Sequence, residues 1–180
     1  MSEEDQAHGG GKADPVEPPA SPGGPVAVSL MLLRLGQRWF AMDARAIEEV
    51  ALRGPVTRVP MAPSHILGVT SLRGRLVTVV GLEQMLGGAG MLPVDNSATL
   101  PRLVVVRDGD FEMAVVAHGI HGLIERAESA APVRPADAPD FVREEFDWQG
   151  GRVSLLDTSR LVAAAARLAG MTSAAEDAIP

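Results

Sequence analysis

The sequence of 180 residues contains no cysteine and no tyrosine, and its single lysine is at position 12. Without cysteine the chain has no disulfide, no thiolate metal site and no cysteine nucleophile. This composition fits a reducing compartment such as the cytoplasm. Only four phenylalanines and two tryptophans are present, so we expect a core built mainly from alanine, valine and leucine.

Long apolar runs are missing as well. No uninterrupted run approaches the roughly 18 residues that a membrane-spanning helix needs, so we expect no direct membrane insertion. The first ten residues, MSEEDQAHGG, are acidic and polar, which is unlike a secretion signal.

The net charge of −7 is concentrated near the two ends of the sequence. Residues 1–25 and 171–180 together hold seven of the 23 acidic residues and the one lysine, so residues 26–170 carry 16 acids against 15 arginines. A nearly neutral body provides no field to attract nucleic acid. We predict a disordered acidic segment over 1–25, a folded domain over 26–170 and a flexible tail over 171–180.

The body reads as short strands separated by glycine and proline, with few helices. Residues 87–101 have the composition of a linker. Asp157 or Thr158 is a good N-cap for a last helix over about 159–169. The other predicted segments are strands at 28–35, 38–42, 47–51, 67–72, 75–80, 102–107, 111–117, 120–126, 141–148 and 152–156, and a short helix at 82–86.

The chain aligns with itself at two nearly equal offsets. At an offset of 76, residues 62–86 match 138–162 without a gap, and Gly74 meets Gly150. At an offset of 73, residues 33–50 match 106–123, and Gly36 meets Gly109. The two matches agree in order and spacing, which indicates an internal duplication.

Each repeat would supply about five short strands. Five such strands cannot bury both faces as an open sheet, so we expect each set to curl into a small barrel. The predicted fold is mainly β, with two five-stranded barrels packed together, short helices and a C-terminal helix. We place the first barrel at about 28–86 and the second at about 101–158. The seam between two barrels is a place where a partner's side chain can insert.

Arg73-Gly74-Arg75 interrupts an apolar stretch and invites two interpretations. The two arginines are either solvated side chains at a hairpin tip, or a pair of guanidinium groups presented to a partner's carboxylates or carbonyls. Nearby apolar residues leave a similar choice. Some could form a docking patch or all could belong to the core, namely Ile47, Val50, Leu67, Val69 and Leu72.

The sequence offers no catalytic constellation. His118 and His121 would lie on opposite faces of an extended chain, so we expect no metal site there. No serine lies in a G-x-S-x-G turn, and the pairs Glu48-Glu49 and Glu144-Glu145 are typical of solvated surfaces. A binding protein is therefore favoured over an enzyme, and the alternative is a barrel protein that binds a small molecule in its seam.

Several blocks together resemble the CheW-like domain family of bacterial chemotaxis adaptors. They are FAMDARAIEEV, VTRVPMAPSHILGVTSLRGRLVTVVGL, MAVVAHGIHGLI and GGRVSLLDTSRLV, and the most specific is the run Gly68–Gly74. The resemblance covers about residues 28–168. It implies two SH3-like barrels, no enzymatic activity and no cofactor.

The resemblance also implies partners. Members of the family couple the cytoplasmic tips of methyl-accepting chemoreceptors to the C-terminal domain of a CheA-type histidine kinase. The expected location is the cytoplasm, at membrane-associated receptor arrays, and the expected state is a monomer with weak self-association in those arrays.

The family's receptor-binding positions carry over to Ile47, Glu49, Gly68 and Arg73. Three other positions depart from the usual pattern. Ser71 replaces asparagine, Gly81 replaces aspartate, and His118 replaces a second aspartate. We expect the docking surface to be altered at these three sites.

Overall fold

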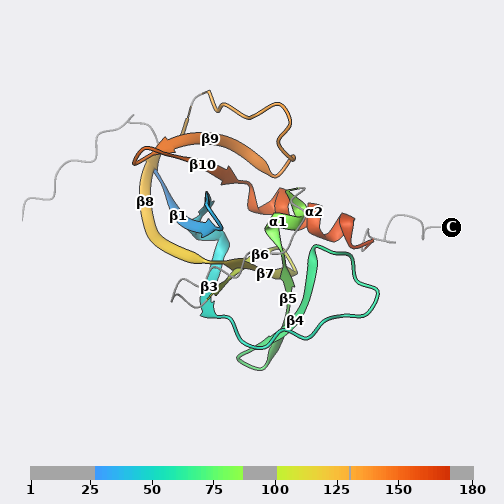
Figure 1. The fold of residues 1–180 in the computed structure, drawn as a ribbon. Coiled ribbons are helices and arrows are strands. Elements are labelled where there is room, and N and C mark those ends of the chain that lie inside the picture. The colour runs from blue at the N-terminus through green and yellow to red at the C-terminus, as the bar shows by residue number, and fades with distance from the viewer. Residues whose placement is uncertain (1–26, 87–100, 130, 171–180) are drawn as a thin grey trace, which may run out of the picture.

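A computed structural model describes residues 27–86, 101–129 and 131–170 (Figure 1). The predicted tails at 1–25 and 171–180 and nearly all of the predicted linker at 87–101 lie outside the described residues.

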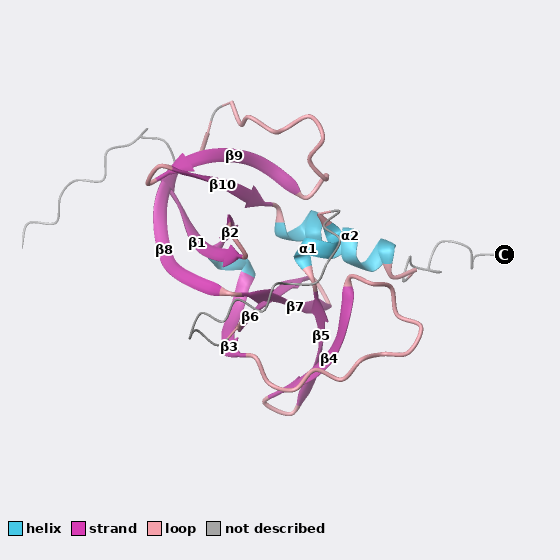
Figure 2. Cartoon of the chain, in the orientation of Figure 1, coloured by secondary structure: helices cyan, strands magenta, loops and turns pink. Residues whose placement is uncertain are grey.

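The described chain is mainly β, with two α-helices and one short 3-10 turn (Figure 2). The bounds agree closely with those expected from the sequence. The elements are β1 (Ala27–Leu35), β2 (Arg38–Asp43), η1 (Ala44–Ala46), β3 (Ile47–Leu52), β4 (Ile66–Leu72), β5 (Arg75–Val80), α1 (Leu82–Met85), β6 (Arg102–Asp108), β7 (Phe111–Ala117), β8 (Gly119–Ala127), β9 (Val142–Trp148), β10 (Gly151–Leu156) and α2 (Thr158–Leu168).

The strands form two five-stranded sheets. Sheet A has the order β8-β1-β2-β10-β9, and sheet B has the order β3-β6-β7-β5-β4. In Figure 1 the blue strand β1 lies among the yellow to red strands β8, β9 and β10, whereas the cyan to green strands gather below. The two-barrel architecture expected from the sequence is confirmed.

The predicted division of the chain between the barrels is wrong. Barrels at 28–86 and 101–158 would keep each repeat to itself, but sheet B is built from residues 47–117 and sheet A from 27–43 with 119–156. The third strand of each repeat crosses over and pairs with the first strand of the other repeat, as β3 with β6 and β8 with β1. Propensity and periodicity locate strands but do not state which strands pair.

The duplication itself is confirmed by strand order and by local irregularities. Replacing β1 to β5 by β6 to β10, and the reverse, converts the order of sheet A into that of sheet B. Bulges fall at equivalent positions, at Glu48 in β3 and His121 in β8. A second equivalent pair of bulges lies at Leu67 in β4 and Arg143 in β9.

Three clusters of buried side chains hold the described fold together. One lies inside each barrel, including Val77 and Val105 in sheet B and Leu32 and Val153 in sheet A. The largest lies between the barrels. Alternate residues of β6 explain the arrangement, because Leu103 and Val105 face the barrel interior while Val104 and Val106 face the other barrel. Both faces of such strands are buried, which is why they are apolar throughout.

The two helices follow equivalent strands but differ in length. Asp157 caps α2, because its Oδ1 accepts a 2.9 Å hydrogen bond from the backbone N–H of Arg160. The equivalent residue before α1 is Gly81, which provides no side-chain cap, and α1 is only four residues long. Among the described residues, no helix is long and apolar enough to span a membrane.

Candidate functional site

The Arg-Gly pair forms the two-residue turn between β4 and β5. Arg73 has φ 48° and Gly74 has φ 81°, so both central residues are left-handed, as in the type I′ turns that suit two-residue hairpins. Gly74 adopts this conformation without a side-chain penalty. Arg73 is therefore at the tip of the hairpin, and its side chain is 83% exposed.

Two adjacent glutamates of β3 face this turn. The bulge at Glu48 interrupts the usual alternation, so Glu48 and Glu49 turn to the same side of the strand. Arg73 Nη2 lies 3.1 Å from Glu49 Oε2. Arg75 lies within 3.6 Å of Glu48 and within 3.8 Å of Glu49. Two of the predicted site residues, Glu49 and Arg73, are thus brought together by an ion pair.

The ion pairs extend into β6 and β7 through two residues that sequence reasoning did not select. Arg107 donates to Glu48 Oε1 at 2.6 Å and to Glu112 Oε2 at 3.3 Å, and Arg75 donates to Glu112 at 2.9 Å. We call the set Glu48, Glu49, Arg73, Arg75, Arg107 and Glu112 the charge network. Its members come from four strands and the β4–β5 turn, so spacing along the sequence gave no signal of the association.

The charge network is balanced and partly shielded from water. The hydrogen bond from Arg107 holds the pKa of Glu48 below its usual value of 4.5, and the same bond raises the pKa of Arg107. Glu49 Oε1 and Glu112 Oε1 are buried without a hydrogen-bond partner within the described residues. An exposed pair such as Arg73–Glu49 adds only about 0–1 kcal/mol to stability. The network therefore fixes the position of Arg73 more than it strengthens the fold.

Gly68 is buried in β4, away from solvent. Residues 53–65 cross over this strand, and Thr57 and Val69 exchange two backbone hydrogen bonds of 2.8 Å. A Cβ at Gly68 would collide with the carbonyl oxygen of Thr57, and its φ of 145° is one that other residues rarely adopt. Gly68 thus holds the crossing segment close to the sheet, and a partner cannot contact its backbone face without moving that segment.

The apolar residues near the turn divide between core and surface. Leu72 is 8% exposed and belongs to the core inside sheet B. Val50 is 40% exposed on β3, and Leu52 lies on the same face of the strand. Ile47 is half-buried and packs against the cluster between the barrels. The interpretation that all five residues belong to the core is therefore wrong, and the exposed Val50 agrees with the interpretation that some of them lie at the surface.

The three departures from the family pattern lie in different settings. Ser71 is exposed on β4, near the turn. Gly81 precedes α1, as described above. His118 is buried, and its Nδ1 accepts a 2.7 Å hydrogen bond from the backbone N–H of Gly36. Only Ser71 therefore lies at the exposed surface where we expected all three.

Sheet A carries aromatic rings at two of the positions equivalent to the charge network, and a third ring lies beside them. Trp39 matches Glu112 and His121 matches Glu48 by the offset of 73, whereas Trp148 matches Leu72 by the offset of 76. The three rings pack edge to face, with centroids 6.2 Å apart for Trp39–His121 and 4.5 Å apart for His121–Trp148. This aromatic cluster holds both tryptophans of the chain.

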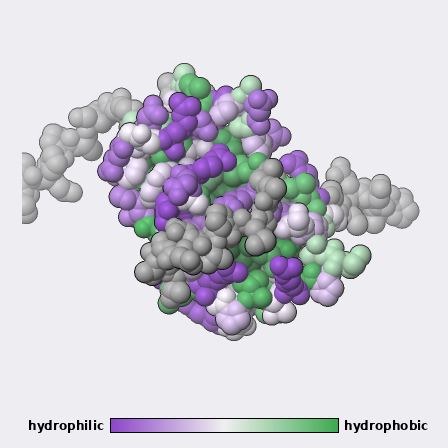
Figure 3. Space-filling view, in the orientation of Figure 1, coloured by the Kyte–Doolittle hydropathy of each residue, from purple (hydrophilic) through white to green (hydrophobic). Residues whose placement is uncertain are grey.

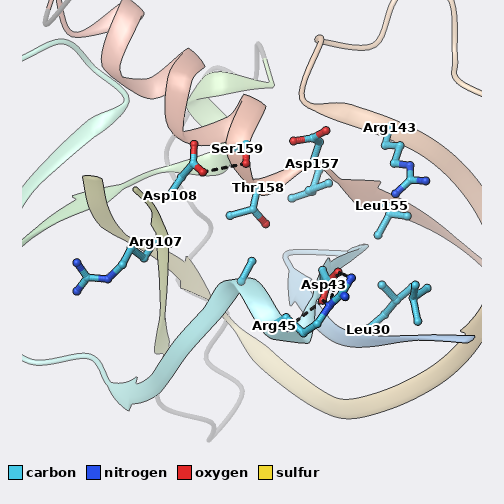
Figure 4. Close-up of a pocket in the computed structure, with 13 residues that line it drawn as sticks. Leu30, Asp43, Arg45, Arg107, Asp108, Arg143, Leu155, Asp157, Thr158 and Ser159 are labelled. Atoms are coloured by element: carbon cyan, nitrogen blue, oxygen red, sulfur yellow. Dashed lines mark hydrogen bonds and ion pairs between the residues drawn. The ribbon is translucent and has the colours of Figure 1, made fainter. Parts of the chain in front are cut away.

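A polar pocket of about 510 Å³ opens at the seam between the barrels. It lies between η1 and the start of α2, and Leu30 and Leu155 contribute to its apolar part (Figure 4). Arg45 lines it while paired with Asp43 through a 2.6 Å contact, which lowers the pKa of Asp43 below its usual value of 3.8. Figure 3 shows a face of the molecule on which hydrophilic residues are interspersed with patches of hydrophobic ones.

The geometry suits binding better than chemistry on a substrate. Among the described residues, no group of histidines and carboxylates is placed to hold a metal ion. The carboxylates and guanidinium groups of the charge network neutralise each other.

Comparison with known proteins gives a consistent result. A profile of the CheW-like domain family matches residues 29–166. The crystal structure of the scaffolding protein TtCheW from Thermoanaerobacter tengcongensis superposes with a TM-score of 0.64 at 19% identity, covering 78% of this chain and 90% of that one. At this identity the superposition supports the fold alone.

Curated relatives are similar over part of their length. The chemotaxis protein CheW of Klebsiella aerogenes is 26% identical over 64% of this chain and 65% of its own. The Thermotoga maritima protein of the same name is 26% identical over 56% of this chain and 63% of its own. The probable chemotaxis protein CheW of Rhizobium etli is 32% identical over 38% and 43%. The chain thus spans about two thirds or less of the length of these three relatives.

Proposed function

The chain belongs to the CheW-like domain family, which is a family of non-enzymatic scaffolds, and from that premise we propose that it couples chemoreceptors to a CheA-type histidine kinase. In this role it binds the cytoplasmic tip of a receptor on one surface and the C-terminal domain of the kinase on another. It acts in the cytoplasm, at arrays of membrane-bound receptors. Its contribution is to hold two proteins in a fixed geometry.

The ion pair between Glu49 and Arg73 is the observation that carries the proposal. Two of the family's receptor-binding positions, far apart in the sequence, meet at one exposed turn, with nitrogen and oxygen 3.1 Å apart. The Arg73 side chain is anchored at one edge and 83% exposed over the rest. A guanidinium group held in this way loses less conformational freedom when a partner's carboxylate or carbonyl binds it.

The neighbouring surface provides the apolar part of such an interface. Val50 and Leu52 are exposed on β3, the strand that also carries the glutamates paired with Arg73 and Arg75. An amphipathic helix at a receptor tip can place apolar residues on β3 and an acidic residue on Arg73. Gly68 supports this surface indirectly, because it allows residues 53–65 to lie close to β4.

The test is a binding titration with a receptor-tip fragment, comparing wild type with Arg73→Glu. We expect the charge reversal to weaken binding at least tenfold, because it places an acid beside Glu49 and against an acidic partner. Gln149→Glu is the matched control. Gln149 occupies the same position in the equivalent turn of sheet A, with φ 46° against 48°. A folded Arg73→Glu variant that binds the receptor like wild type would contradict the proposal.

Kinase binding should be measured separately with the isolated C-terminal domain of the kinase. We expect Arg73→Glu to keep kinase binding while losing receptor binding. Loss of both with an intact fold would place the two partners on one surface and would overturn the assignment of Arg73 to the receptor.

A further inference from the structure

The pocket at the seam contains a buried polar group that has no partner within the described part of the chain. Thr158 is the first residue of α2 and is 8% exposed, and its Oγ1 has no hydrogen-bond partner among residues 27–86, 101–129 and 131–170. Figure 4 shows this hydroxyl directed from the start of α2 into the pocket, toward Asp43 and Arg45. A buried hydroxyl without a partner destabilises the fold, and a ligand that accepts its hydrogen bond would remove that penalty.

The other polar groups around the pocket already have partners. The carboxylate of Asp43 binds Arg45, Asp108 accepts a 3.0 Å hydrogen bond from Ser159 Oγ, and Asp157 caps α2. The remaining guanidinium groups are paired outward, Arg107 with Glu48 and Arg143 with Glu128. The hydroxyl of Thr158 therefore differs from the neighbouring polar groups, because it has no hydrogen-bond partner within the described residues.

The repeat offers an internal comparison. By the offset of 76, Thr158 corresponds to Leu82, which is 1% exposed and lies in the core between the barrels. By the offset of 73, Arg45 corresponds to His118, whose ring is buried against Gly36. At that equivalent place the protein fills the space with its own side chains. At the start of α2 the corresponding residue is Thr158, and Arg45 pairs with Asp43.

We propose that this pocket binds a small oxyanion, a carboxylate or a phosphate, that accepts a hydrogen bond from Thr158 Oγ1 at the N-terminus of α2. The helix has 11 residues, and its N-terminus favours negative charge. Arg45, Arg107 and Arg143 are among the residues that line the same pocket, and their guanidinium groups are paired with Asp43, Glu48 and Glu128. Leu30 and Leu155 offer apolar contacts to the carbon skeleton of an organic anion. This binding role does not depend on the coupling of receptor and kinase.

The test is a titration of the full chain followed by amide NMR shifts, with acetate, succinate and inorganic phosphate as separate probes. We expect saturable shifts at residues 157–160 with at least one probe, and the order of affinity identifies a carboxylate or a phosphate as the preferred ligand. Acetamide has the shape of acetate without its charge and should bind much more weakly. Equal binding of acetate and acetamide, or no shift at these residues with any probe, would overturn the proposal.

Two substitutions sharpen the result. Thr158→Val removes the hydroxyl at nearly constant volume and should weaken binding roughly tenfold, whereas Thr158→Ser should restore it. Thr57→Val, at an exposed threonine in the segment 53–65, is the matched control. Asp108→Asn removes a negative charge from the pocket and should strengthen anion binding. Weaker binding in this variant, or unchanged affinity in a folded Thr158→Val protein, would contradict the assignment.

Discussion

Sheets A and B have the same strand order, equivalent bulges and equivalent turns, but they carry different chemistry at equivalent positions. The turn that holds Arg73 and Gly74 in sheet B holds Gln149 and Gly150 in sheet A, with φ values that agree within a few degrees. The bulge that presents Glu48 in one sheet presents His121 in the other. The two sheets therefore share one backbone arrangement. It accommodates the charge network in sheet B and the aromatic cluster in sheet A. Comparing the two sheets identifies the candidate binding residues, because the backbones of the sheets are equivalent and only the side chains differ.

The largest expected effect concerns the crossing of strands between the repeats. A fragment that ends at residue 86 contains β1 and β2 of sheet A and β3 to β5 of sheet B, so neither sheet is complete and the cluster between the barrels is exposed. We expect this fragment to remain unfolded by circular dichroism and amide NMR. A fragment 1–86 that unfolds cooperatively on its own would contradict the observed pairing of strands.

Gly68 and its equivalent residue in sheet A provide the second comparison. The offset of 76 places Glu144 at this position, so sheet A accepts a side chain where sheet B does not. We expect Gly68→Ala to lower the free energy of unfolding by about 2–4 kcal/mol, through the collision with Thr57 and the strained φ.

Gly74→Ala is the control, because no atom lies within 4 Å of a Cβ built there. It should cost only about 1 kcal/mol, from its positive φ. Urea unfolding of both variants measures the difference, and equal losses would remove the role assigned to the crossing segment.

The aromatic cluster should contribute less than the core. Replacing Trp148 by leucine, the residue at its equivalent position in sheet B, removes two ring contacts. We expect the free energy of unfolding to fall by about 1–2 kcal/mol. The residual fluorescence then comes from Trp39 alone. No change in stability would show that the ring contacts on sheet A are incidental.

The smallest expected effect is the response of the charge network to acid. Arg107 lowers the pKa of Glu48, so the stabilisation is present above the unfolded value of 4.5 and is lost as the pH falls through the lower folded value. Asp43 behaves in the same way below 3.8 because of Arg45. Glu48→Gln should flatten the fall of the melting temperature between pH 5 and pH 3 by a small amount. A steeper fall of the melting temperature in Glu48→Gln would contradict the prediction, because it would mean that ionised Glu48 does not stabilise the fold.

The sequence predicted the strands, the duplication and the two-barrel fold because these depend on alternation, glycine turns and repeated spacing. It placed Glu49 and Arg73 in one site through the family resemblance, and the structure brings them together. The sequence failed to predict the features that depend on pairing between strands far apart along the chain. The crossing of β3 and β8 moves two of the five strands of each predicted barrel into the other sheet. Arg107 and Glu112 join the network only because β6 and β7 lie beside β3 and β5.

His118 illustrates a different limit. The sequence placed it among residues of a docking surface, but the folded chain buries its ring against the β1–β2 turn. The sequence does not indicate which segment of the chain will pack over a single polar residue at the end of a strand. Thr158 was noted only as a possible helix cap, and its unpartnered hydroxyl depends on how η1 and α2 meet.

The most direct test of the account exchanges the two charges, with Arg73→Glu and Glu49→Arg combined in one chain. The ion pair at the turn is then retained with its direction reversed, so the fold should be kept. If the exposed guanidinium of Arg73 binds the receptor tip, the double variant should bind as weakly as Arg73→Glu alone in a calorimetric titration. Recovery of wild-type affinity in the double variant would show that the pair only supports the fold, and would contradict a docking role for this turn.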